Sequence, residues 1–204
     1  MMKLILSLAL IWMLSSTAGA LQCQNTQNSS LVDCNKYCAA AAIQSSSGEQ
    51  QSKLCLSSSV CKPNNQTFSY NIGFSNLTAF VHCCNTNDCN RQNVSYPVVQ
   101  ETNKLQCLTC DDDQSTVCNK IEWCVGVQDR CISGSVMVSN NIKKAFGCAS
   151  KNLCGDTPEL RYLDVYLNFT NGPKCCGTNR CNSAWTVKLS VVPFLLGLIL
   201  LVAR

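Results

Sequence analysis

The side chains that could support chemistry in this sequence are a single histidine, a run of aspartates and eighteen cysteines. His82 is the only histidine and stands directly before Cys83, at the expected end of a strand. A catalytic or metal-binding histidine needs partners placed around it, and the sequence contains no second imidazole. We therefore expect His82 to be a structural residue.

The spacing Cys107-x2-Cys110 is compatible with a pair of zinc ligands or a redox-active dithiol. The cysteine count is even, however, and this favours bridge formation instead. A nucleophilic cysteine would be an unpaired thiol with a lowered pKa, and none is left over. Because no general base, nucleophile or metal-ligand set can be assembled, we predict no enzyme activity, no metal and no cofactor.

The run Asp111-Asp112-Asp113 is the one cluster of like charge in the sequence. Three carboxylates could hold calcium, but consecutive side chains point in different directions and no spaced ligand loop follows. We expect a solvated loop at this position, and a contact for a basic partner is the alternative.

The organising motif of the chain is a double cysteine followed by four residues and Cys-Asn. It occurs at 83–90 and again at 175–182. The distance between the copies is too long for a solenoid unit and indicates two tandem copies of one small domain. Each copy also begins with Leu-Gln-Cys, at Leu21 and at Leu105.

These limits define two domains, 21–90 with eight cysteines and 105–182 with ten. The connecting segment, 91–104, is polar and contains Pro97, which is typical of a linker. Domains of this size bury too little apolar surface to be stable without cross-links, so the cysteines are expected to pair.

Both ends of the chain indicate the secretory pathway. Residues 1–20 combine Lys3, an apolar run and Ala18-Gly19-Ala20, which is the pattern of a signal peptide. The cysteine content, close to 9%, is typical of an extracellular protein held together by disulfides.

Residues 183–204 are predicted to be a second removed segment. Leu189–Ala203 is uncharged, and as a helix it spans about 22 Å, less than the roughly 30 Å hydrocarbon core. Three small residues, Asn182-Ser183-Ala184, and a short spacer precede it, as in a glycosylphosphatidylinositol (GPI) attachment signal. We predict attachment at Asn182 or Ser183, and a transmembrane helix is the alternative.

Processing changes the charge of the protein. The full chain has sixteen Lys and Arg against twelve Asp and Glu. Lys3, Lys188 and Arg204 lie in the two removed segments, so thirteen basic residues remain and the net charge is +1. No basic field is left that would attract nucleic acid or anionic lipid.

The residue pattern predicts short strands. Phe68, Tyr70, Ile72 and Phe74 alternate with smaller residues, which is the period of a half-buried strand. Ser133-Gly134 and Asn140-Asn141 are turn signals around a strand that contains Met137. Ala39–Ile43 could form one turn of helix. The expected fold class is small all-β and disulfide-rich.

The repeat resembles the three-finger domain of the Ly-6/uPAR (LU) family, and the Cys-Cys-x4-Cys-Asn ending is the specific part of the likeness. The likeness covers nearly all of 21–182 and implies two tandem three-finger domains. The first domain departs from the ten-cysteine form because Thr26 stands where the second has Cys110. The pairs that the resemblance implies are Cys23–Cys38, Cys34–Cys55, Cys61–Cys83, Cys84–Cys89, Cys107–Cys131, Cys110–Cys118, Cys124–Cys148, Cys154–Cys175 and Cys176–Cys181.

Several residues are candidates for modification or for partner contact. The sequence has five N-glycosylation sequons, at Asn28, Asn65, Asn76, Asn93 and Asn168. Possible contacts with a protein partner are Lys143, Lys144, Tyr162 and Tyr166, for which solvated lysines and core tyrosines are the alternatives.

The resemblance implies a non-enzymatic, GPI-anchored glycoprotein on the outer face of the plasma membrane. Its finger faces would bind an extracellular or cell-surface protein in a receptor, adhesion or modulatory role. The gamma-type phospholipase inhibitors are also similar, with two such domains and an eight-cysteine first one. The alternative is therefore a secreted inhibitor of phospholipases, against which the attachment signal argues.

Overall fold

A computed structural model describes residues 20–27, 30–61, 65–98, 100–155, 167–170 and 172–183. The predicted small, all-β, disulfide-rich fold is confirmed. In the described ranges the one helical element is the short 3-10 helix η1 (Lys151–Leu153). The signal peptide and the apolar C-terminal tail lie outside the described residues, apart from Ala20 and Ser183 at their borders.

The first repeat contributes six described strands, all joined to antiparallel neighbours. They are β1 (Leu21–Asn25), β2 (Ser30–Cys34), β3 (Tyr37–Ser45), β4 (Gly48–Leu56), β5 (Asn65–Asn71) and β6 (Asn76–Cys84). β1 and β2 form a separate hairpin, and β3 lies between β4 and β6. β5 contains the first part of the predicted alternation, with Phe68 and Tyr70 buried.

The second repeat contributes five described strands and η1. The strands are β7 (Thr102–Thr109), β8 (Lys120–Val125), β9 (Arg130–Val138), β10 (Asn141–Ala149) and β11 (Lys174–Cys176). β7 and β8 form a hairpin like that of β1 and β2, while β10 and β11 flank β9. β7 thus begins three residues before Leu105, inside the segment predicted to be linker.

The run Ala39–Ile43 is strand, not helix. These residues occupy the middle of β3 and all are buried, because β3 has a neighbour on each side and is covered on both faces. Alanine has a high helix propensity, but burial in a central strand overrides it. The small side chains also hide the alternation that would otherwise indicate a strand.

The turn predicted at Ser133-Gly134 is also wrong, since both residues lie within β9. Gly134 is needed there because a Cβ atom at this position would come within 2.7 Å of Cδ1 of Phe169. A glycine in a strand often marks such a close approach. The actual turn is formed by Ser139 and Asn140, both with positive φ, as a two-residue hairpin loop between β9 and β10 requires.

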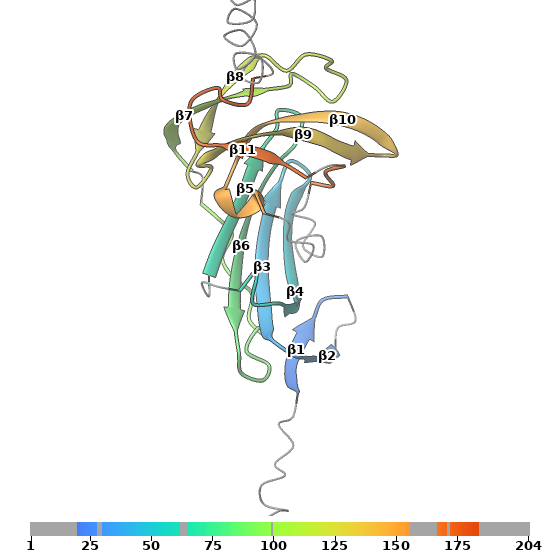
Figure 1. Cartoon of the computed structure of the whole chain (residues 1–204). Coiled ribbons are helices and arrows are strands. Elements are labelled where there is room, and N and C mark those ends of the chain that lie inside the picture. Colours follow the sequence, from blue (N-terminus) through green and yellow to red (C-terminus); the bar gives the residue numbers. More distant parts are fainter. Residues whose placement is uncertain are drawn as a thin grey trace, which may run out of the picture.

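One sheet spans both repeats. Its seven described strands run in the order β11-β9-β10-β5-β6-β3-β4, so that β10 of the second repeat pairs with β5 of the first. In Figure 1, β9 and β10 cross the end of the layer formed by β3 to β6. Side chains from both repeats also share one hydrophobic cluster, which includes Phe68 and Ile72 with Ile132 and Ala149.

The contact between β5 and β10 is extended by polar side chains. The Ser69 N–H donates to Oγ of Ser150 (3.0 Å), and the Ser150 N–H donates to the Ser69 carbonyl (2.8 Å). Gln128 Nε2 donates to Oγ of Ser69 (2.9 Å), and Asn152 Nδ2 donates to the Thr67 carbonyl (2.9 Å). The repeats are therefore held together by backbone and side-chain bonds as well as by apolar packing.

Candidate functional site

All eighteen cysteines lie in the described ranges and form nine disulfides, with no free thiol among them. The pairs are the nine that the resemblance implies. Each bridge closes within one repeat, and none joins the two. Buried cysteines form one compact cluster in each repeat, while Cys61 and Cys83 belong to the hydrophobic cluster that both repeats share.

The asparagine that closes the first motif fastens two strands. Asn90 is 1% exposed. Its Oδ1 accepts from the Gln24 N–H at 2.9 Å, and its Nδ2 donates to the Gln24 carbonyl at 3.0 Å. The same Nδ2 donates to the Ala39 carbonyl at 2.9 Å, so one side chain joins β1 to β3.

The second repeat reproduces this arrangement. Asn182 is 4% exposed. Its Oδ1 accepts from the Leu108 N–H (3.0 Å), and its Nδ2 donates to the carbonyls of Leu108 (2.8 Å) and Ile132 (3.0 Å). Asn182 thus joins β7 to β9. The two copies of the motif therefore have the same structural role: in each repeat a disulfide and a buried asparagine side chain hold the strands together.

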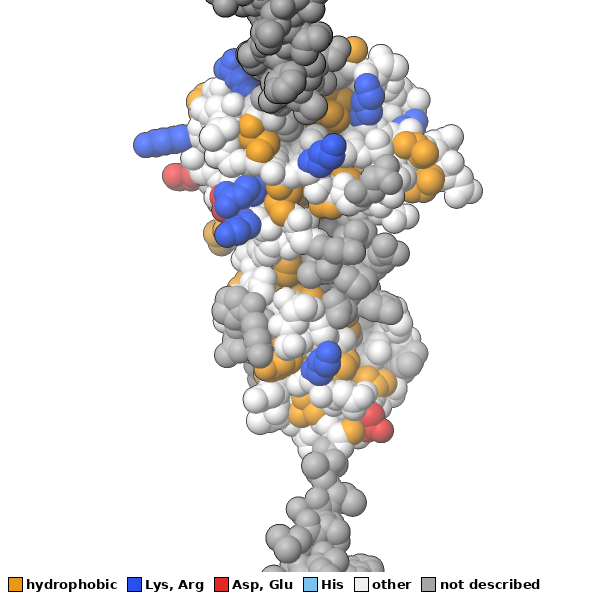
Figure 2. Space-filling model, viewed as in Figure 1, with side chains coloured by type: hydrophobic (Ala, Val, Ile, Leu, Met, Phe, Trp, Pro, Cys, Tyr) orange, Lys and Arg blue, Asp and Glu red, His pale blue; other side chains and the backbone are white. Residues whose placement is uncertain are grey.

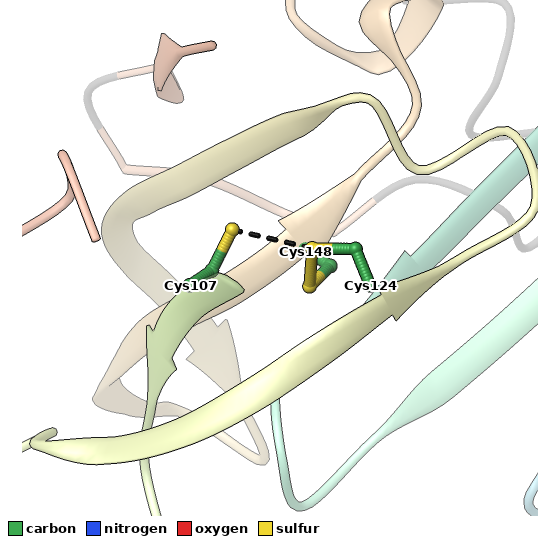
Figure 3. A group of neighbouring side chains, drawn as sticks. All are labelled: Cys107, Cys124 and Cys148. Atoms are coloured by element: carbon green, nitrogen blue, oxygen red, sulfur yellow. Dashed lines mark hydrogen bonds between the residues drawn. A yellow bond between two sulfur atoms is a disulfide. The ribbon is translucent and has the colours of Figure 1, made fainter. Parts of the chain in front are cut away.

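Three cysteine sulfurs converge in the second repeat, as Figure 3 shows for Cys107, Cys124 and Cys148. The sulfurs lie within 4.8 Å of one another, and Sγ of Cys107 is 3.3 Å from Sγ of Cys124. Each belongs to a disulfide, so no thiolate is present to bind a metal. The cluster is a contact between two stacked bridges.

The other chemically suggestive residues have local partners. His82 Nδ1 lies 2.7 Å from Oδ1 of Asn65, across the β5–β6 pair. Cys107 and Cys110 belong to different bridges, so their spacing is not that of a redox pair.

The three aspartates do not converge on a common point. Oδ1 of Asp112 accepts from the hydroxyl of Ser115 (2.8 Å) and from the Gln114 N–H (2.9 Å). The Ser115 bond, followed by the bond from Gln114, lowers the pKa of the Asp112 carboxyl. Asp113 instead faces Lys143, with 3.6 Å between Oδ2 and Nζ. This is a solvated loop of the expected kind.

The two predicted contact lysines lie on opposite faces of β10. Lys143 is opposite the buried Val136 and its side chain is mostly covered beside Asp113. Lys144 is exposed, and its Nζ donates to the Thr116 carbonyl. Tyr162 and Tyr166 lie outside the described residues.

Lys144 belongs to an open face of the β9–β10 hairpin that sequence reasoning did not identify. The face is formed by β9, β10 and β11, and its groove of about 370 Å³ is lined by Ser133, Gly134, Ser135, Lys144, Phe146, Thr170, Gly172 and Lys174. Beyond the groove, Met137 and Ile142 are cross-strand partners near the hairpin tip. Their exposed fractions are 39% and 65%. We call the residues that line the groove, together with Met137 and Ile142, the finger-two face.

Four of the predicted glycosylation sites lie in the described ranges and are exposed: Asn65, Asn76, Asn93 and Asn168. Asn28 lies outside them. Asn65 and Asn76 stand on β5 and β6 of the first repeat. The carbonyl of Asn168 accepts from the Met137 N–H at 2.9 Å, so this sequon adjoins the finger-two face.

Within the described ranges, no helix has the length and apolar character needed to cross a bilayer. A scan against models of known protein families finds none that matches the chain.

Proposed function

We propose that this chain is a non-enzymatic cell-surface glycoprotein of the Ly-6/uPAR three-finger type, attached by a GPI anchor, that binds a protein partner. Two features support the family proposal. The nine disulfides follow the family's pairing in both repeats. The asparagine after the last cysteine has the same three hydrogen bonds in each repeat.

The observation that carries the binding role is the finger-two face. Met137 and Ile142 place apolar surface next to each other at the end of a long hairpin, where no described element covers them. Contiguous exposed apolar surface is typical of protein contact sites. Lys144 and Lys174 line the adjoining groove, so the preferred partner presents an apolar group flanked by carboxylates.

The experiment for this proposal is proximity labelling on living cells with an enzyme fused after the signal peptide of the full chain. We expect the wild-type protein to label a small set of surface proteins that the variant Ile142→Ser does not label. Val98→Ser is the matched control, because Val98 is 77% exposed and lies in the inter-repeat segment. Equal labelling by all three proteins would contradict a binding role for this face.

The anchor proposal specifies the attachment residue. The side chain of Asn182 is buried and has three hydrogen bonds, so an anchor on its own carboxyl would lie directly against the fold, and we propose that Ser183 receives the lipid. We expect a phosphatidylinositol-specific phospholipase C to release the protein from cells. Mass spectrometry of the released protein should give a C-terminal peptide that ends at Ser183 and carries ethanolamine.

Three other results would argue against this account. A C-terminal peptide ending at Asn182 would contradict the assignment of Ser183. Retention on the cell after phospholipase treatment would indicate a transmembrane tail. If the protein appears in the medium of cells that were not treated with phospholipase C, and if the purified protein inhibits secreted phospholipases, the secreted inhibitor would be favoured.

A further inference from the structure

A second exposed apolar surface of the second repeat lies on the β7–β8 hairpin. Cys107, Thr109 and Cys124 are fully buried, so this side of the hairpin faces the disulfide layer. Side chains alternate along a strand, and therefore Leu108, Ile121 and Trp123 point to the opposite side.

These three residues form one continuous surface. Ile121 is the cross-strand partner of Leu108, and Trp123 is the partner of Gln106. Ile121 is 44% exposed and Trp123 is 49% exposed, while Leu108 is half-buried. We call Leu108, Ile121 and Trp123 the hairpin-one face. β8 pairs with β7 alone, and the exposed side chains of Ile121 and Trp123 show that this side of the hairpin is open.

The C-terminal end of the described chain lies beside this face. The guanidinium of Arg180 donates to Oε1 of Gln106 through Nε (3.1 Å) and through a terminal nitrogen (2.7 Å). The Arg180 N–H also donates to the Gln106 carbonyl (2.7 Å), and Asn182 is bonded to Leu108. Ser183 follows Arg180 by three residues, a span of at most about 10 Å.

We propose that the hairpin-one face lies against the headgroup layer of the phospholipid bilayer to which the chain is attached. The inference rests on the proposed membrane attachment, because the apolar tail of the sequence begins a few residues after Ser183. Attachment at Ser183 tethers the chain to the bilayer beside this face, because Arg180 is bonded to Gln106, the cross-strand partner of Trp123. An indole beside aliphatic side chains suits that layer, since its ring is apolar and its N–H is polar.

The charges around the face agree with this orientation. Lys104 and Arg180 are exposed near the hairpin, whereas Lys120 is the cross-strand partner of the buried Thr109 and lies on the hairpin's other side. In the view of Figure 2, most of the lysine and arginine side chains lie over the second repeat, and several lie at its β7–β8 end. Cations at this level can contact lipid phosphates, while the finger-two face remains free for a protein partner.

The protein contains an internal reporter for this contact. Its three tryptophans are Trp12, Trp123 and Trp185, of which the first and last lie in the segments predicted to be removed. The emission of the mature protein is therefore that of Trp123. We suggest reconstituting the anchored protein, purified from cells, in phosphatidylcholine vesicles with and without brominated acyl chains. The same protein released by phospholipase C and mixed with identical vesicles is the control.

For the anchored protein we expect blue-shifted emission, shielding from iodide and about two-fold quenching by the brominated lipid. The released protein should show none of these effects. Ile121→Ser should reduce the quenching, and Ile142→Ser on the finger-two face should not. Identical, unquenched emission in both samples would overturn the proposal. Trp123 could instead become more shielded from iodide as the number of protein molecules per vesicle rises, without quenching by the brominated lipid. That result would overturn the proposal in favour of contact with a second copy of the chain.

Failure of the lipid anchor gives a different result. A chain that floats with the vesicles but resists the phospholipase has kept its apolar tail. This result contradicts the lipid anchor, but it does not contradict the contact between the hairpin-one face and the bilayer. The same quenching measurement then applies to the variant Trp185→Phe, since Ser183 still adjoins the bilayer. Unquenched Trp123 in that variant would overturn the proposed contact.

Discussion

Replacing Asn90 with alanine is expected to lower the free energy of unfolding by about 3 kcal/mol, because three hydrogen bonds are lost at a buried site. The substitution leaves the Gln24 N–H and the carbonyls of Gln24 and Ala39 without this partner. The site is sealed, so water cannot replace the amide at low cost. Denaturation in urea, with the disulfides intact, measures the loss.

Asn87→Ala is the matched control for this prediction. Asn87 is exposed and accepts one bond, from the Gln22 N–H at 3.1 Å. Its removal should cost about 1 kcal/mol or less, since water can take its place. If Asn90→Ala costs no more than Asn87→Ala, the buried asparagine is not what fastens β1 to β3.

Replacing Gly147 with alanine is expected to weaken the junction between the two repeats. A Cβ atom there would collide with the carbonyl oxygen of Asn71 and come within 2.8 Å of Cα of Ile72. Both are backbone atoms of the first repeat, so β10 must move away from β5. We expect a loss of about 3 kcal/mol, comparable to overpacking in a core, and faster proteolysis of the segment 91–104.

Gly155→Ala provides the comparison, because a Cβ atom at that position would meet nothing within 4 Å. It should leave the urea midpoint and the proteolysis rate close to those of the wild type. Equal behaviour of the Gly147 and Gly155 variants would show that β5 and β10 are not closely joined in solution.

The sequence carried most of the information about the disulfide framework. The repeated Cys-Cys-x4-Cys-Asn motif indicated two copies of one unit, and the resemblance based on it implied the same nine pairs that the structure contains. Cysteine spacing is informative because each disulfide joins two defined positions of the fold. The local role of Asp112 was equally predictable, since its partners are two and three residues away.

Features that depend on contacts between distant segments were not predictable from the pattern. The run Ala39–Ile43 has no alternation, because both faces of β3 are buried. Gly134 resembled a turn residue, but the reason for it is the ring of Phe169. The pairing of β5 with β10 leaves no periodic signal, since it joins only two residues of each strand.

The exposed faces present a different case. Ile121 and Trp123 alternate with Glu122 and Cys124, so a strand with one outward apolar side could have been read from 120–125. Sequence alone cannot say which side of such a strand is covered. The location of Lys143 and Lys144 on opposite faces of β10 follows from the same alternation once the strand is known.

The central claim is that the finger-two face binds a protein partner. Its most direct test is the affinity of the purified, phospholipase-released protein for the surface protein labelled on cells, measured for the wild type, Ile142→Ser and Val98→Ser. We predict about a ten-fold weaker affinity for Ile142→Ser, equivalent to about 1.4 kcal/mol, and an unchanged affinity for Val98→Ser. Equal affinity of Ile142→Ser and the wild type would contradict the account.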